Sequence, residues 1–320
     1  MYGNTIRDLA YQCSLGAFLL REYGIEVTQM NPAQRGYYGE TWKTVGTKGC
    51  YFVKLVYAKA YHETYAHSFA AIDHMHQHGI TDVSTIIKTL TGALYSHFDS
   101  AVCGVFSWVE GANVQNKNTK FAEYRILSSV YTVPIQKLAI GRDSFGTYHA
   151  ESFFRWWAQL EHQHDDKPAQ QLCALFTQYQ QALEARAERL AVLAKRCEVD
   201  TTHFHLTHGD AGGNIITQED NFTLVDWDSV RIAPPERDAW FCLYWDWAMD
   251  AFNEALHARG VHYTLQPDRL AYYCYHSFFY YLAEFQATFS ELHNAGMAET
   301  IEAFFQGWIA EEIAFADKMP

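Results

Sequence analysis

Three oxygen-bearing side chains, Asp210, Asn214 and Asp226, follow one another at intervals that suit phosphoryl transfer. Asp210 and Asn214 lie four residues apart in a loop with two glycines, and Asp226 follows twelve residues later, after the apolar pair Leu224–Val225. Phosphoryl transfer needs one acid that orients and deprotonates the attacking hydroxyl, and oxygen ligands that hold Mg²⁺ on the nucleotide phosphates. Asp210 suits the first task, and Asn214 and Asp226 suit the second.

A nucleotide-binding element is predicted upstream, where residues 26–57 have the pattern of a β-hairpin followed by a third strand. The expected strands are Val27–Gln34, Thr41–Gly46 and Cys50–Val56. The hairpin tip contains Gly36, Tyr37 and Gly39, and glycines there would let backbone N–H groups approach phosphates. Lys54 lies within the apolar third strand, where an ammonium is costly without an anionic partner such as a phosphate. The alternative is an ordinary hairpin whose lysine points to solvent.

The order of these features resembles the aminoglycoside phosphotransferase and choline kinase family. The resemblance rests on the glycine-bearing tip, on Lys54, on the His208–Asn214 loop and on the Asp226–Asp228 unit, spread over roughly residues 27 to 240. Residues 233–238 are also similar to the corresponding segment of the spectinomycin phosphotransferase branch of that family.

This resemblance implies a two-lobed α+β fold like that of protein kinases. A small antiparallel β-sheet lobe, residues 1–110, would bind the nucleotide, and a larger, mainly helical lobe, residues 111–320, would carry catalysis and substrate binding. The resemblance also implies ATP and Mg²⁺ as cofactors. It assigns Asp210 as the catalytic acid, Lys54 as the phosphate-binding lysine, and Asn214 and Asp226 as the metal ligands.

Two departures from the family pattern bear on these roles. Three residues separate Asp210 from Asn214 where most family members have four, and the glycines between them suit a tighter loop. Family members also have a helix glutamate that pairs with the strand lysine, and Glu63 is the glutamate nearest the required place. In the family, the connector between the lobes offers backbone groups to the adenine ring, which places Ser107 and Val109 there.

The spacing of apolar residues predicts the remaining elements. The expected helices span residues 5–23, 61–78 and 169–196, and the expected short strands span residues 85–89 and 101–105. Residues 106–111 would then connect the two lobes. The apolar stripe along residues 169–196 is interpreted as core packing without a functional role.

Carboxylates and aromatic rings are the candidates for binding the acceptor substrate. Trp240 and Asp246 lie in an aromatic stretch that begins after Asp238, and Asp228 lies beside the expected metal ligand Asp226. Rings can cover an ammonium by cation–π attraction while carboxylates pair with amines. The alternative interpretation is that these aromatic side chains pack the core of the helical lobe, because such side chains dominate core burial.

A histidine cluster supports a competing hypothesis from another enzyme class. His203, His205 and His208 precede Asp210 at a spacing similar to the ligand run of metallo-β-lactamase-fold zinc hydrolases, and imidazoles at alternate strand positions share one face. Thr207 stands where that motif has an aspartate, and helices precede the cluster where repeated strands would be expected. His208 is therefore expected to hold the loop by hydrogen bonds instead.

Composition excludes several other classes of protein. The chain has 320 residues, a formal net charge of −13 and 49% hydrophobic residues, which favours a folded protein and argues against nucleic-acid partners. It contains no run of eighteen apolar residues, so no membrane partner is expected. Seven dispersed cysteines without a Cys-x-x-Cys pair, and an N-terminus without a signal-peptide pattern, predict reduced thiols in the cytoplasm.

These patterns together predict an enzyme that transfers the γ-phosphate of ATP to an alcohol group of a small molecule, as a monomer or homodimer. A cationic acceptor agrees with the negative charge of the chain. The leading expectation is an aminoglycoside or aminocyclitol antibiotic such as spectinomycin. The alternatives are a kinase of a metabolic alcohol (choline, an amino acid or a sugar), a nucleotide-binding protein without transfer activity, and the zinc-dependent hydrolase.

Overall fold

The computed structural model describes residues 8–33, 39–241, 245–292 and 294–319. The chain forms two compact units, the first made of residues 1–141 and 205–232 and the second of residues 142–204 and 233–320. This grouping differs from the expected lobes of residues 1–110 and 111–320, which stay a prediction. Each unit has its own core of buried apolar side chains.

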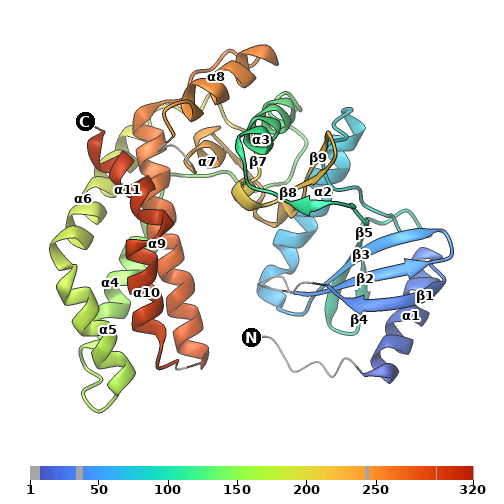
Figure 1. Cartoon of the computed structure of the whole chain (residues 1–320), viewed down its shortest axis with the longest axis horizontal. Helices are drawn as coiled ribbons and strands as arrows, with labels where there is room; N and C mark the ends of the chain where they lie inside the picture. Colours follow the sequence, from blue (N-terminus) through green and yellow to red (C-terminus); the bar gives the residue numbers. More distant parts are fainter. Residues whose placement is uncertain (1–7, 34–38, 242–244, 293, 320) are drawn as a thin grey trace. The chain divides into compact units, whose positions relative to one another are not determined.

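A five-stranded antiparallel sheet organises the first unit, in the order β1-β2-β3-β5-β4 (Figure 1). Its strands are β1 (Val27–Pro32), β2 (Glu40–Gly46), β3 (Gly49–Val56), β4 (Ser96–Phe98) and β5 (Ala101–Ser107). The expected hairpin and third strand are therefore confirmed as β1, β2 and β3, while the hairpin tip at residues 34–38 lies outside the described residues.

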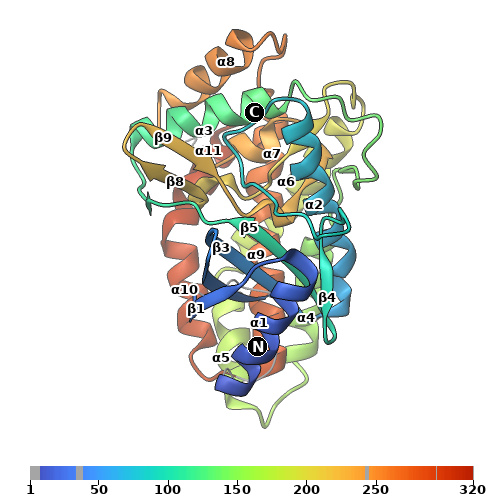
Figure 2. The same cartoon turned by 90° about the vertical axis from the view of Figure 1, so that its right-hand side faces the viewer.

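Alternation along the strands sends side chains to two different faces of this sheet. One face packs against helix α1 (Leu9–Tyr23) (Figure 2). The shared core includes Leu15, Phe18, Trp42, Val53, Leu55 and Val105. Lys54 and Gly104 pair across β3 and β5 on the opposite face, toward helix α2 (His62–Gln77). A Cβ atom at Gly104 would lie 2.3 Å from the ring of Phe69 in α2, so only glycine allows this close approach.

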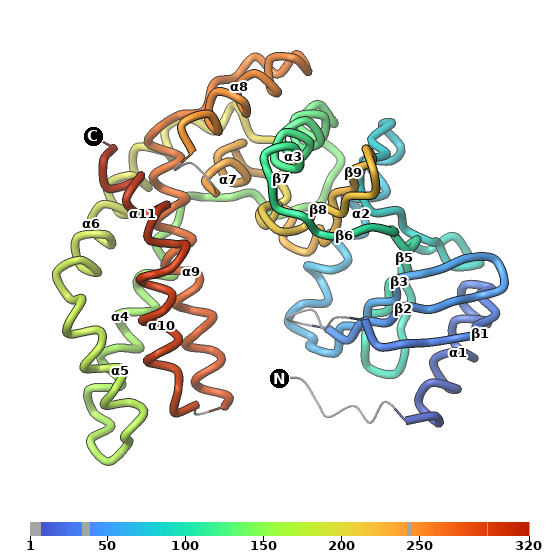
Figure 3. The backbone as a smooth tube through the Cα atoms, viewed as in Figure 1, coloured from blue at the N-terminus to red at the C-terminus, as the bar shows by residue number. Residues whose placement is uncertain are grey.

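A second group of elements, made of short strands and one helix, completes the first unit and carries the predicted chemistry. Its elements are β6 (Ala112–Asn113), α3 (Lys117–Val130), β7 (His205–Thr207), β8 (Ile215–Gln218), β9 (Asn221–Leu224) and β10 (Arg231–Ala233). Strands β8 and β9 form a hairpin and β6 pairs with β8. Figure 3 shows the course of the chain through β6, β8 and β9. Strand β7 pairs with β10. Short 3₁₀ turns at Ala211–Gly213 and Trp227–Ser229 follow Asp210 and Asp226.

The described part of the second unit is helical and is organised around one long helix, α9 (Pro267–Leu292), which packs against α4, α6, α7, α10 and α11. The other helices are α4 (Tyr148–Leu160), α5 (Lys167–Gln178), α6 (Gln180–Cys197), α7 (Glu236–Ala239), α8 (Ala248–Ala258), α10 (Met297–Gln306) and α11 (Trp308–Lys318). Aromatic rings fill this core; Phe153, for example, lies 4.9 Å from Phe176 and 5.9 Å from Phe279 between ring centroids. No helix among the described residues is long and apolar enough to cross a membrane.

Two expected elements differ from the structure. Residues 169–196 were expected to form one helix, but Tyr179, with φ −99° and ψ 7°, separates α5 from α6. The break lets α5 pack on α4 and α10 while α6 packs on α9. The segment expected as a strand at residues 85–89 forms only an isolated bridge, Ile86 with Phe106, because β4 pairs with the first half of β5 and leaves only its second half available.

Candidate active site

Lys54 is held at the centre of the sheet with its ammonium directed at two carboxylates. It is 6% exposed, Nζ donates to Oδ1 of Asp226 at 2.7 Å, and Nζ also donates to Oδ2 of Asp228. An ammonium this deeply buried is costly without anionic partners, so the two acids account for its position. All three residues belong to the first unit.

A buried tryptophan fixes the two carboxylates on either side of it. Trp227 is 1% exposed, its Nε1 donates to the Leu224 carbonyl at 3.0 Å, and its ring centroid lies 4.5 Å from that of His208. Asp226, directly before it, has a left-handed backbone with φ 62°. Such a conformation is uncommon for a residue with a side chain and is often found at functional sites. The turn thus sets both acids toward Lys54.

Desolvation is the largest influence on the pKa of each of these three groups and opposes their charges. For Lys54 the charges of Asp228 and Asp226 outweigh it, and the pKa of Lys54 rises well above 10.5. For Asp226 the charge and hydrogen bond of Lys54 outweigh it, and the pKa of Asp226 falls below 3.8. Asp228 also faces the negative charge of Asp226, and its pKa is raised to about 6.

The raised pKa of Asp228 predicts a pH-dependent stability in the absence of divalent cations. The folded protein binds this proton more tightly than the unfolded chain, so the stabilisation is complete below about pH 4 and is lost as the pH rises through about 6. A change in pKa from 3.8 to about 6 corresponds to roughly 3 kcal/mol. Asp226 contributes to stability in the opposite direction, because its pKa is lowered in the folded protein. That stabilisation is lost only as the pH falls below 3.8, outside the interval from about pH 4 to 6.

Urea unfolding of the wild type and of Asp228→Asn, between pH 4 and 7 in EDTA, measures this contribution. The stability of the wild type relative to the variant should fall as the pH rises from about 4 to about 6. If the stability difference between the wild type and Asp228→Asn stays flat or grows from about pH 4 to about pH 6, the Asp228 carboxyl group does not titrate in that interval.

The loop that carries Asp210 is held by His208, as the sequence predicted. His208 is fully buried, its Nδ1 accepts from the Asp210 N–H at 3.1 Å, and its Nε2 lies 2.9 Å from the Val225 carbonyl. Since Nδ1 accepts this hydrogen bond, Nε2 must carry the ring hydrogen and donate it to the Val225 carbonyl. A neutral imidazole therefore links the Asp210 loop to the residue just before Asp226.

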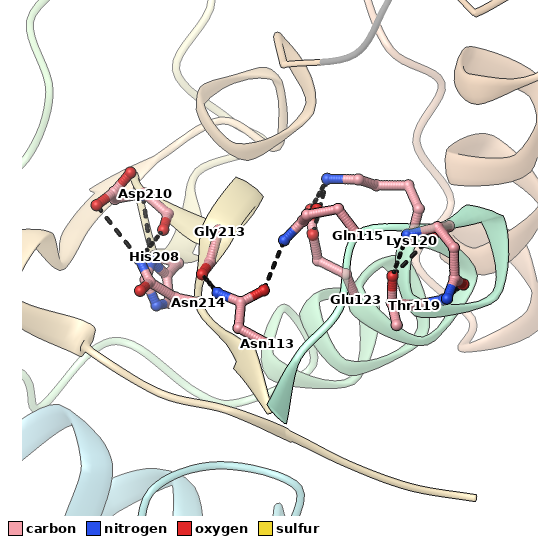
Figure 4. A network of polar contacts seen from close by, with 10 residues as sticks. Asn113, Gln115, Thr119, Lys120, Glu123, His208, Asp210, Gly213 and Asn214 are labelled. Carbon is pink, nitrogen blue, oxygen red and sulfur yellow. Dashed lines mark hydrogen bonds and ion pairs between the residues drawn. The ribbon is translucent and has the colours of Figure 1, made fainter. Parts of the chain in front are cut away.

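Asn214 closes the loop over Asp210 despite the short interval between them. Its Nδ2 donates to the Asp210 carbonyl at 2.6 Å and to Oδ2 of Asp210 at 3.3 Å. Its own carbonyl accepts from the Val225 N–H at 2.8 Å, at the end of the β8–β9 hairpin. The 3₁₀ turn at Ala211–Gly213 accommodates the three intervening residues, and Asn113 on β6 donates to the Gly213 carbonyl (Figure 4).

The structure does not bring Glu63 to Lys54. The Glu63 side chain is 86% exposed and lies 4.0 Å from His67. Tyr65 occupies the buried face of α2 instead: its hydroxyl donates to Oδ2 of Asp228 at 2.8 Å, and its ring centroid lies 5.1 Å from Nζ of Lys54. The sequence did not single out Tyr65, because a carboxylate was the group expected on this helix.

The structure tests some, but not all, of the other residues predicted to bind the nucleotide. Gly36 and Tyr37 lie outside the described residues. Gly39 is described, and a Cβ atom there would lie 2.9 Å from the Leu55 carbonyl, so strand packing already requires glycine. The Ser107 N–H donates to the Thr85 carbonyl at 2.9 Å and is therefore engaged within the chain. Val109 stays a prediction.

The expected substrate residues outside the first unit lie among aromatic side chains. Trp240 is 8% exposed, and its ring centroid lies 5.8 Å from that of Phe241 and 6.3 Å from that of Trp308. Asp246 is exposed, between Trp245 and Trp247, whose rings stack at 5.2 Å. This environment agrees with the packing interpretation for Trp240, and the substrate roles of both residues stay predictions.

The histidine cluster does not assemble a zinc site. His205 Nδ1 lies 2.8 Å from the Tyr131 carbonyl, both ring nitrogens of His208 are engaged by the backbone, and the His203 ring lies 4.7 Å from that of Tyr263. Among the described residues, no group of three or more His, Cys, Asp or Glu side chains is arranged to hold a metal ion. The zinc-hydrolase alternative therefore gains no support.

Several solved structures with the same fold are kinases or phosphotransferases. A spectinomycin phosphotransferase, APH(9)-Ia, in complex with ADP and spectinomycin, is similar with a TM-score of 0.76 and 20% identity, over 96% of this chain and 97% of that chain. A microcompartment-associated aminopropanol kinase has a TM-score of 0.65 and 15% identity, over 96% and 97%. The amicoumacin kinase hAmiN, in complex with AMP-PNP, has a TM-score of 0.61 and 13% identity, over 100% and 97%.

At these identities the structural likeness establishes the fold, and the expected kinase-like α+β class is confirmed. A search of curated proteins found no match. A sequence model described as the phosphotransferase enzyme family matches residues 29–273, and so confirms the expected enzyme class, a phosphotransferase with an alcohol group as acceptor. Because that match covers most of the chain, this protein belongs to the phosphotransferase enzyme family.

Proposed function

We propose that this chain transfers the γ-phosphate of ATP to a hydroxyl group of a small amine-bearing molecule in the cytoplasm. Asp210 would orient and deprotonate the acceptor hydroxyl, and Lys54 would bind the nucleotide phosphates. Asn214 and Asp226 would hold Mg²⁺. Asp228 would face the acceptor substrate. The observation that carries the proposal is the convergence of Lys54, from β3, with the two acids that follow β9.

The donor atoms at this site fit Mg²⁺. Asp226 supplies carboxylate oxygens and Asn214 an amide oxygen, which are the hard ligands that this ion prefers. The hydrogen bond from Val225 to Asn214 keeps these two residues at the same end of the β8–β9 hairpin. When bound, Mg²⁺ would neutralise charge on the nucleotide phosphates.

The sheet also offers a surface for the nucleotide base. Phe52 lies two residues before Lys54 on β3, so the two side chains share one face. Its ring centroid lies 6.3 Å from that of Phe106 and 6.4 Å from that of Trp108, next to the expected connector. Stacking on these rings would place a base beside the phosphates held by Lys54. The ADP and AMP-PNP complexes of the similar proteins support nucleotide use here.

The acceptor is proposed to be an aminoglycoside or aminocyclitol, with spectinomycin as the first compound to test. The fold likeness to a spectinomycin phosphotransferase and the formal charge of −13 support an amine-bearing acceptor. A small amino alcohol is the second candidate, because an aminopropanol kinase has the same fold over nearly its whole length. Both candidates combine an amine with a hydroxyl.

A coupled assay of ADP release, run over aminocyclitols, aminoglycosides, choline and small amino alcohols, tests this proposal. We expect release that depends on one acceptor class and falls to background when EDTA removes Mg²⁺. The same panel with GTP measures nucleotide preference. Acceptor-dependent release with EDTA present would contradict the metal role, and release by no acceptor with either nucleotide would contradict the proposed substrates.

A further inference from the structure

Tyr65 lies on the face of α2 that packs against the Trp227–Ser229 turn. It is 2% exposed, whereas Glu63, two residues earlier, is turned to solvent. Positions two apart on a helix point about 200° apart, so the two side chains cannot both face the sheet. A buried position of α2 that contacts Lys54 and Asp228 therefore carries a phenol.

The Tyr65 hydroxyl and the Lys54 ammonium donate to the same oxygen, Oδ2 of Asp228. The ring of Tyr65 also lies 5.1 Å from the ammonium, within range of a cation–π contact. Burial raises the pKa of Tyr65 above its usual value, so the phenol stays protonated and remains a donor at neutral pH. One side chain thus contacts both members of the ion pair.

We propose that Tyr65 is a positioning residue that allows Lys54 to move from Asp228 to the nucleotide phosphates. When the ammonium turns to a phosphate, Oδ2 of Asp228 keeps the Tyr65 hydroxyl as its donor. Without that hydroxyl the carboxylate would lose its buried partner, and release of Lys54 would cost more. This inference rests on the proposed nucleotide site.

The test measures the dissociation constant of MgATP and steady-state kinetics for Tyr65→Phe. This variant keeps the ring and removes the donor, so the dissociation constant and the KM for MgATP should rise about tenfold. Tyr65→Leu, which also removes the ring, should be weaker still. Tyr23→Phe is the matched control, since it removes a buried tyrosine hydroxyl bonded to the Cys103 carbonyl on the α1 face of the same sheet.

A double-mutant cycle shows whether the hydroxyl acts through Asp228. In an Asp228→Asn background the tenfold effect of Tyr65→Phe should shrink to less than about twofold. If Asp228→Asn binds too weakly to measure, the contrast between Tyr65→Phe and Tyr23→Phe decides alone.

Each outcome separates this inference from the proposed function. If the wild type binds MgATP and Tyr65→Phe binds it equally well, the inference fails and the proposed function stands. The inference also fails, and the proposed function also stands, if Tyr65→Phe only lowers the melting temperature, as Tyr23→Phe would. The outcome is the same if Tyr65→Phe weakens MgATP binding as much in the Asp228→Asn background as in the wild type. Failure of the folded wild type to bind MgATP would overturn both.

Discussion

Replacing Asp210 by Ala or Asn should lower kcat by about 10² to 10⁴-fold, while the affinity for MgATP stays close to that of the wild type. The loop should keep its shape, because His208 accepts from the backbone N–H of Asp210 and Asn214 donates to its carbonyl. What is lost is the carboxylate that would deprotonate the acceptor hydroxyl. Steady-state kinetics with an acceptor from the screen, together with a nucleotide titration, measure the two quantities.

Asp220→Asn is the matched control for this result. Asp220 is an exposed aspartate in the turn between β8 and β9, in the same segment of the chain, and its replacement should leave kcat unchanged. Transfer by Asp210→Ala at the wild-type rate would remove Asp210 from the catalytic role.

Replacing Lys54 by Met should abolish measurable MgATP binding and also destabilise the fold. Removing one member of a buried ion pair typically costs 3–5 kcal/mol, and the 43% exposure of the Asp226 side chain favours the lower end, about 3 kcal/mol. Asp226 and Asp228 would then repel each other without the ammonium between them. Urea unfolding in EDTA measures the stability, and calorimetric titration measures the binding.

Lys48→Met, in the exposed turn between β2 and β3, is the control for the loss of a positive charge near the same strand. It should leave both stability and binding near wild-type values. Retained MgATP affinity in Lys54→Met would mean that another group holds the phosphates, even if the variant were destabilised as expected.

The elements that local patterns determine were predictable from the sequence. Strand β3 is a short apolar run bounded by turn residues, and the loop from His208 to Asn214 has residue types that few other chemistries require. The hydrogen-bonding role of His208 also followed from its place between a strand and an acidic loop. These features depend on neighbours close in the chain, which a single sequence contains.

Long-range features were not predictable in the same way. The partners of Lys54 include residues more than 170 positions away, and the rotation of α2 that buries Tyr65 and exposes Glu63 is set by packing against Gly104 and the Trp227 turn. The break at Tyr179 has the same origin, because α5 and α6 pack on different helices while their apolar stripe continues across it. Sequence periodicity carries no information about such choices.

The most direct test of the nucleotide site is a calorimetric titration of the wild-type chain with ATP, with and without Mg²⁺. The arrangement of Lys54, Asp226 and Asn214 predicts saturable binding that Mg²⁺ strengthens and that Lys54→Met removes. A folded wild-type protein that binds neither MgATP nor MgGTP would contradict the assignment of this cluster as a phosphoryl-transfer site.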